Sequence, residues 1–182
     1  VYPNIAAYEI LAQGENFKSL SGQIPGLTAV PQPKDSTVNL NLAALIAHME
    51  MGKQLIFSED KITSYRDSLF NNWKKQNSKE FKNAKEYAEQ VVDHLNGWIK
   101  KDNYAQTRTM SKFTVNTDDP SRWQPTPPSY MDGIEPHWNK IRTMVLDSAA
   151  QFKPAKHPEF SLDKKSKFYQ ELKEVYDISQ RI

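Results

Sequence analysis

Apolar residues recur at helical spacing along most of the chain, and residues 79–101 show the clearest pattern. One face of this predicted helix carries the side chains of Phe81, Ala84, Tyr87, Ala88, Val91, Val92, Leu95, Trp98 and Ile99. The opposite face carries lysines and acids, as in an amphipathic helix that covers a core. Ser78 is predicted to cap its first turn. Trp98 is therefore expected inside the protein.

Other segments show the same period. Residues 38–52 are apolar nearly all round, which is typical of a helix at the centre of a bundle. Residues 59–76 follow a Ser58 cap and begin with two acids, and they carry an apolar stripe that ends at Trp73, a second expected core residue. Further helices are predicted at 2–12, near 104–110, at 139–149, and from Ser161 or Asp163 to about 180.

Prolines and glycines separate these segments. Residues 13–37 and 102–136 are rich in such breakers, and the densest Pro-rich connection covers about 113–136. No segment alternates as a strand would. The sequence predicts an all-α fold in which residues 1–182 are a single helical region of five or six helices with long Pro-rich loops.

Composition narrows the range of functions. The chain has 24 basic and 22 acidic residues, so its net charge is +2, and only 5 of the basic residues are arginine. A nucleic-acid partner is not expected from this balance. The absence of cysteine excludes disulfides, thiolate metal sites and a thiol nucleophile. The longest apolar run, Leu42–Ala47, is too short to predict a transmembrane segment.

Candidate chemistry is sparse. The histidines do not have zinc-ligand spacing, and no phosphate-binding glycine loop or nucleophile elbow is present. We therefore predict no catalytic, cofactor-binding or metal-binding residue in this chain. Trp123, Tyr130, His137 and Trp138 gather in the Pro-rich region. They either form a ligand or partner surface or pin the long loop to the helical bundle.

The Pro-rich region carries a distinctive motif. Residues 123–130 read Trp-Gln-Pro-Thr-Pro-Pro-Ser-Tyr, and residues 135–138 read Glu-Pro-His-Trp. This stretch closely resembles bacterial proteins of the type 2 phosphatidic acid phosphatase and vanadium-dependent haloperoxidase superfamily. The similarity to that family extends to Phe152–Pro154 and Tyr169–Val175 and, more weakly, to Tyr2–Leu11.

The resemblance implies a non-catalytic role. The family's signature comprises a Lys and an Arg-Pro, then Pro-Ser-Gly-His, then Ser-Arg followed by a second His, which together bind phosphate or vanadate. None of these motifs occurs in this sequence. The chain thus resembles the N-terminal helical half of such a protein, a scaffold whose vanadate or phosphate would belong to the other half. The resemblance leaves acid phosphatase and haloperoxidase chemistry open, and it implies a periplasmic or secreted location.

Two expectations about partners follow. The chain opens at Val1 without Met and closes directly after an amphipathic helix, so we expect a processed or fragmentary chain. We also expect an exposed apolar face, covered by the C-terminal catalytic half or by a second copy. The alternative is a stand-alone helical binding module that uses the Trp- and Pro-rich region as its surface.

Overall fold

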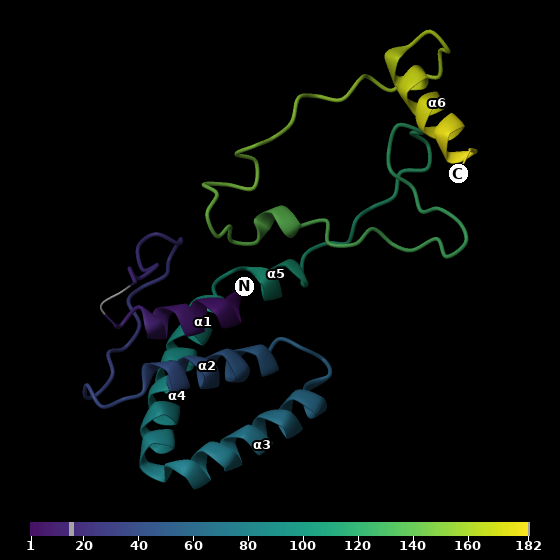
Figure 1. Cartoon of the computed structure of the whole chain (residues 1–182). Coiled ribbons are helices and arrows are strands. Elements are labelled where there is room, and N and C mark those ends of the chain that lie inside the picture. The colour runs from purple at the N-terminus through teal and green to yellow at the C-terminus, as the bar shows by residue number, and fades with distance from the viewer. Residues whose placement is uncertain (15–16, 182) are drawn as a thin grey trace.

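A computed structural model describes residues 1–14 and 17–181 (Figure 1). Its elements are α1 (Tyr2–Leu11), α2 (Leu40–Lys53), α3 (Glu59–Gln76), α4 (Ser78–Ile99), α5 (Tyr104–Thr107), the 3₁₀ helix η1 (Trp138–Lys140) and α6 (Lys167–Ser179). Five of these helices have ten residues or more. No strand occurs within the described ranges, and the all-α prediction is confirmed.

The core lies where α1, α2 and α4 meet. The largest fully buried apolar side chains are Ile10 of α1, Ile46 and Met51 of α2, and Val91 and Leu95 of α4. The alanines of α2 are buried as well, and such small side chains let neighbouring helices approach closely. The prediction of a central helix at 38–52 is therefore confirmed, because α2 packs against both α1 and α4.

Asparagines cap two of the core helices. Oδ1 of Asn39 accepts the Leu42 N–H at 2.9 Å, and Oδ1 of Asn77 accepts the Glu80 N–H at 3.1 Å. The predicted cap Ser78 is instead the first residue of α4. The predicted cap Ser58 makes no capping hydrogen bond, because its backbone is not extended as a capping residue's usually is. The prediction for Ser78 is wrong, whereas Ser58 occupies the predicted N-cap position of α3 but its hydroxyl does not cap the helix.

The apolar stripe of α3 is only partly covered, near its C-terminal end. No residue of α3 is buried, and Ile62 and Tyr65 are exposed. Trp73 and Phe70 are only partly buried against the core, where Phe70 meets Phe81 edge-on at 5.4 Å. The prediction that Trp73 belongs to the core is wrong, because α3 diverges from α2 after the turn that joins them (Figure 1). The prediction for Trp98 is confirmed, since it is buried.

Two helix predictions near the C-terminus need correction. Instead of a helix at 139–149, the chain has η1 and then irregular backbone, because Ile141 is extended and the next residue is tied to the end of α4. The last helix begins at Lys167, not at Ser161 or Asp163. The Asp163 carboxylate is used in a turn, accepting the Lys165 N–H, and Ser166 caps α6 instead.

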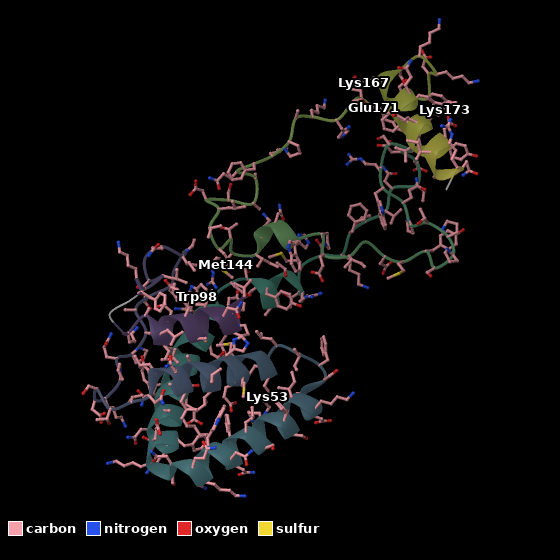
Figure 2. The ribbon with its side chains drawn as sticks, in the orientation of Figure 1. Lys53, Trp98, Met144, Lys167, Glu171 and Lys173 are labelled. Carbon is pink, nitrogen blue, oxygen red and sulfur yellow. The ribbon has the colours of Figure 1, made fainter. Side chains whose placement is uncertain are left out.

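The C-terminal part lies away from the core. Figure 1 shows the chain leaving α4, passing through long connections, and ending in α6 at the opposite end of the molecule. Lys167, Glu171 and Lys173 of α6 are correspondingly remote from Trp98 (Figure 2). Leu172 and Val175 of α6 are exposed, and α6 packs against no other helix in the described part of the chain. No described helix has the length and hydropathy needed to cross a bilayer.

Candidate functional site

Residues 102–142 form a projection that we call the arm, and its two ends meet beside the C-terminus of α4. The Arg142 N–H donates to the carbonyl of Asp102 at 2.8 Å. One step further out, Nδ2 of Asn103 donates to the carbonyl of Lys140 at 3.0 Å. Asn103 adopts a left-handed backbone conformation, with φ of 73°, in which the chain turns out of α4. The arm therefore leaves and rejoins the core at one point.

The base of the arm is a buried polar cluster. The Tyr2 hydroxyl donates to Oδ2 of Asp102 at 2.6 Å, and the Tyr104 N–H donates to Oδ1 at 2.8 Å. The Arg142 guanidinium lies 3.8 Å from the ring centre of Trp98 and donates to the Trp98 carbonyl at 3.0 Å. Burial, followed by the hydrogen bond to Asp102, raises the pKa of Tyr2 to about 12. The cluster ties α1, α4 and both arm ends together.

Further contacts join the two sides of the arm. Trp138 meets Tyr104 edge-on at 6.5 Å, and the Arg108 guanidinium lies 4.6 Å from the Tyr104 ring centre. Arg108 also forms an ion pair with Glu135. Nε2 of His137 lies 2.8 Å from the Ser111 carbonyl, within hydrogen-bond distance. These contacts join residues 104–111 to residues 135–138, and we call this paired part of the arm the stem.

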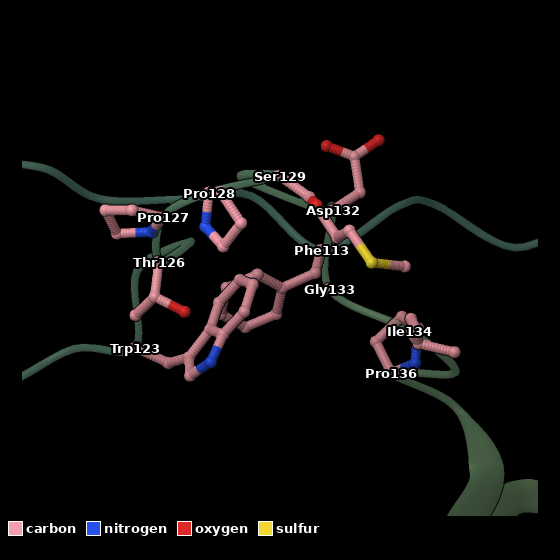
Figure 3. A pocket seen from close by; sticks show the side chains of 11 residues that line it. Phe113, Trp123, Thr126, Pro127, Pro128, Ser129, Asp132, Gly133, Ile134 and Pro136 are labelled. Atoms are coloured by element: carbon pink, nitrogen blue, oxygen red, sulfur yellow. The ribbon is translucent and has the colours of Figure 1, made fainter.

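The tip of the arm contains a hollow of about 600 Å³ (Figure 3). Phe113 and Trp123 meet edge-on at 5.5 Å in its wall. A Cβ on Gly133 would lie 2.9 Å from Cβ of Phe113, so this close approach requires glycine. The remaining lining residues are Thr126, Pro127, Pro128, Ser129, Met131, Asp132, Ile134 and Pro136. The hollow is mainly apolar, with one carboxylate at its edge.

The structure separates the four residues predicted to form a ligand or partner surface. Trp123 lines the hollow at the tip, and Tyr130 lies exposed beside it but outside the lining. His137 and Trp138 belong to the stem. Trp138 joins the two sides of the arm by packing against Tyr104, and it does not attach the arm to the helical bundle. A shared surface of these four residues stays a prediction.

Sequence reasoning did not single out Phe113 or Arg142. Phe113 lies ten residues before Trp123, at the start of the Pro-rich connection. This nearness in sequence is the one signal that could have marked Phe113 as a candidate site residue. Arg142 carried no signal, because its partner Trp98 lies 44 residues earlier in the sequence.

Four of the five arginines are not arranged to bind vanadate or another small oxyanion. Such a group needs several cationic donors that converge on one point. Here Arg66, Arg108 and Arg122 each form an ion pair with a carboxylate, and Arg142 is stacked on Trp98. Across residues 1–14 and 17–181, His, Asp and Glu side chains form no group of three that could hold a metal ion.

Comparison with solved structures decides the resemblance. A crystal structure described as the first bacterial vanadium-dependent iodoperoxidase matches 100% of this chain with 61% sequence identity and a TM-score of 0.95. The chain is similar to part of that iodoperoxidase. The resemblance predicted from the Trp- and Pro-rich motif is confirmed. No family model and no curated protein matches the chain.

The iodoperoxidase is the longer of the two. This chain spans 44% of its length, so more than half of the iodoperoxidase lies outside the match. Because the match covers all of this chain with a TM-score of 0.95, the core, the arm and α6 are arranged alike in both structures.

Proposed function

We propose that this chain is the non-catalytic helical scaffold of a vanadium-dependent haloperoxidase-like protein. The observation that carries the proposal is the match of the whole chain to less than half of the iodoperoxidase at 61% identity. In this proposal the catalytic groups and the vanadate lie in the remainder of that protein, and the scaffold supports them. The match also favours a haloperoxidase over the phosphatase that the sequence left open.

Exposed apolar surfaces support a scaffolding role. Phe57, in the turn between α2 and α3, is fully exposed, and Ile62 and Tyr65 expose the first part of the apolar stripe of α3. Leu172 and Val175 expose the apolar face of α6. Large apolar surfaces on soluble proteins usually mark interfaces. The catalytic remainder is the partner that the proposal assigns to them, and a second copy of the chain is the alternative partner.

A chimera tests the proposal. The matched part of the iodoperoxidase is replaced by this chain, and vanadium-dependent iodide oxidation is measured beside phosphatase activity. We expect a folded chimera with iodoperoxidase activity, because the shared architecture holds the catalytic part in place. A chimera that folds as judged by circular dichroism but lacks both activities would contradict the scaffold proposal. Phosphatase activity alone would overturn the choice of a haloperoxidase.

A stand-alone helical binding module is the second candidate, favoured by the hollow beside Trp123. Here the chain by itself would be monomeric, and a ligand would change its tryptophan fluorescence. A chain that forms aggregates through its exposed apolar surfaces, and stays soluble only beside the catalytic remainder, would exclude this candidate. The periplasmic or secreted location remains a proposal that follows from the family resemblance.

A further inference from the structure

We infer that the hollow at the arm tip is a docking socket for a large apolar side chain from the part of the longer protein outside this chain. The inference rests on the proposed function, and it adds the place where this chain contacts the remainder of the longer protein. The core packing of α1, α2 and α4 does not use the arm tip, so this surface is free for a partner.

The chemistry of the socket selects an apolar occupant. Phe113, Trp123 and Ile134 expose 42%, 49% and 72% of their surfaces there. The carboxylate of Asp132 points away from the hollow in Figure 3 and lies 3.9 Å from the Lys112 ammonium. A charged or strongly polar group would find few partners inside, whereas an aliphatic or aromatic side chain would bury the exposed rings.

The arm is built to hold the socket in position. Its base is closed by the Tyr2, Asp102 and Arg142 contacts, and its stem by the Arg108–Glu135 pair. A partner therefore meets an arm whose conformation is already set, and binding requires little further ordering of the backbone. An extended segment without such contacts would lose much of its binding energy to that ordering.

The comparison points to the occupant. The arm has the same placement in the crystal structure of the iodoperoxidase, where more than half of the chain lies outside the match. The arm projects alike in two proteins of 61% identity, and in this inference the apolar rings that it exposes in the present chain require a cover. The remainder of the longer protein meets that requirement without a second copy or a foreign partner.

Two-chain complementation tests the socket. The part of the iodoperoxidase outside the match is co-expressed, with an affinity tag, beside this whole chain, and the amount of this chain that co-purifies is measured. Phe113→Ala and Trp123→Ala empty the socket wall. Lys112→Ala is the matched control, because Lys112 precedes Phe113 in the chain, is exposed and does not line the hollow, and its ammonium pairs with the Asp132 carboxylate at the edge, at 3.9 Å. Far-ultraviolet circular dichroism and thermal unfolding of each variant alone verify that the α1–α4 core stays folded.

The outcomes separate this inference from the proposed function. We expect co-purification with the original chain and with Lys112→Ala, and a reduction of about tenfold or more for both socket variants. Equal co-purification of all variants would overturn the socket, although an active chimera would still uphold the scaffold. No co-purification of the original chain would also overturn it. Self-association of the chain alone that Trp123→Ala abolishes would assign the socket to a second copy and overturn the stated occupant.

Discussion

The hydroxyl of Tyr2 donates a 2.6 Å hydrogen bond to the carboxylate of Asp102, a residue 100 positions later in the sequence. The ring of Tyr2 also meets Trp98 edge-on at 5.5 Å. Asp102 in turn accepts the Tyr104 N–H, and its carbonyl accepts the Arg142 N–H. A single buried acid thus joins the first helix, the end of α4 and both ends of the arm.

Removing the Tyr2 hydroxyl should destabilise the chain. Tyr2→Phe keeps the ring against Trp98 but deprives the buried Asp102 carboxylate of a donor, so we expect a loss of about 1–3 kcal/mol in the free energy of unfolding. Urea unfolding at neutral pH measures it. Tyr8→Phe is the control, because the Tyr8 hydroxyl makes a 2.9 Å hydrogen bond to Lys18 in an exposed setting. Equal losses for the two variants would contradict the role given to the base of the arm.

The phenol of Tyr2 should also make the stability of the chain depend on pH in the alkaline range. Burial raises the pKa of Tyr2 from 10.0 to about 12, so the folded state retains a proton that the unfolded state releases. Its stabilising contribution is complete below pH 10 and is lost as the pH rises from 10 to 12. Burial raises the pKa of Tyr87 likewise. We expect Tyr2→Phe and Tyr87→Phe each to flatten the decline in thermal midpoint over this range, and the double variant to flatten it most. An unchanged decline in all three would refute this assignment.

Arg142 should control the rigidity of the arm. Arg142→Met keeps an unbranched apolar stem but removes the guanidinium stacked on Trp98. That contact is worth about 1–2 kcal/mol in a partly buried setting. We expect chymotrypsin to cut the arm faster at Phe113 and Trp123, while the α1–α4 core resists. Arg122→Met makes the same change at an exposed arm residue paired with an acid. Cleavage of the two variants at the same rate would show that the guanidinium does not hold the arm.

Truncation at two neighbouring positions of α2 should change the free energy of unfolding by very different amounts. Ile46 is fully buried, so Ile46→Ala should cost about 2–5 kcal/mol through lost contacts and the cavity it leaves. Leu45 is 55% exposed, and Leu45→Ala should change stability by about 0.5 kcal/mol or less. Denaturant unfolding of the chain by itself compares them. Similar losses would mean that α2 is not the central helix of the core.

Glu9 should be needed to fix the loop after α1. Its carboxylate is fully buried and accepts the Ser19 hydroxyl at 2.7 Å and the Leu20 N–H at 2.6 Å. Glu9→Ala leaves that N–H without a partner and should cost about 1–3 kcal/mol. Glu9→Gln retains an acceptor and should cost less. Amide hydrogen exchange at Leu20 reports the contact directly, and unchanged protection in Glu9→Ala would disprove its importance.

Much of the helical framework was readable from periodicity. The predicted segments 2–12, 38–52, 59–76 and 79–101 agree with α1 to α4 within about two residues, because long amphipathic runs leave few alternatives. The helix predicted at 139–149 does not form, because long-range contacts override the local pattern. Arg142 is held by the Asp102 carbonyl and the Trp98 ring, and these distant partners keep the backbone before it extended.

The candidate site was harder to predict. The sequence drew attention to Trp123 in the Pro-rich connection, and this residue lines the hollow. It could not show that Phe113 would complete the wall of the hollow while His137 and Trp138 would lie in the stem. That division follows from the pairing of the two sides of the arm. The pairing depends on contacts such as Arg108 with Glu135, which lie 27 residues apart.

By itself, the sequence determined the all-α class, the helical segments that became α1 to α4, and the family resemblance, since local periodicity and a short motif carry that information. Tertiary structure decided which apolar faces are buried and which stay exposed. The stripes of α3 and α6 repeat at the same helical spacing as that of α4, yet only α4 has fully buried residues. The physical reason is that burial depends on which segments meet in space, and local spacing along the chain does not specify that.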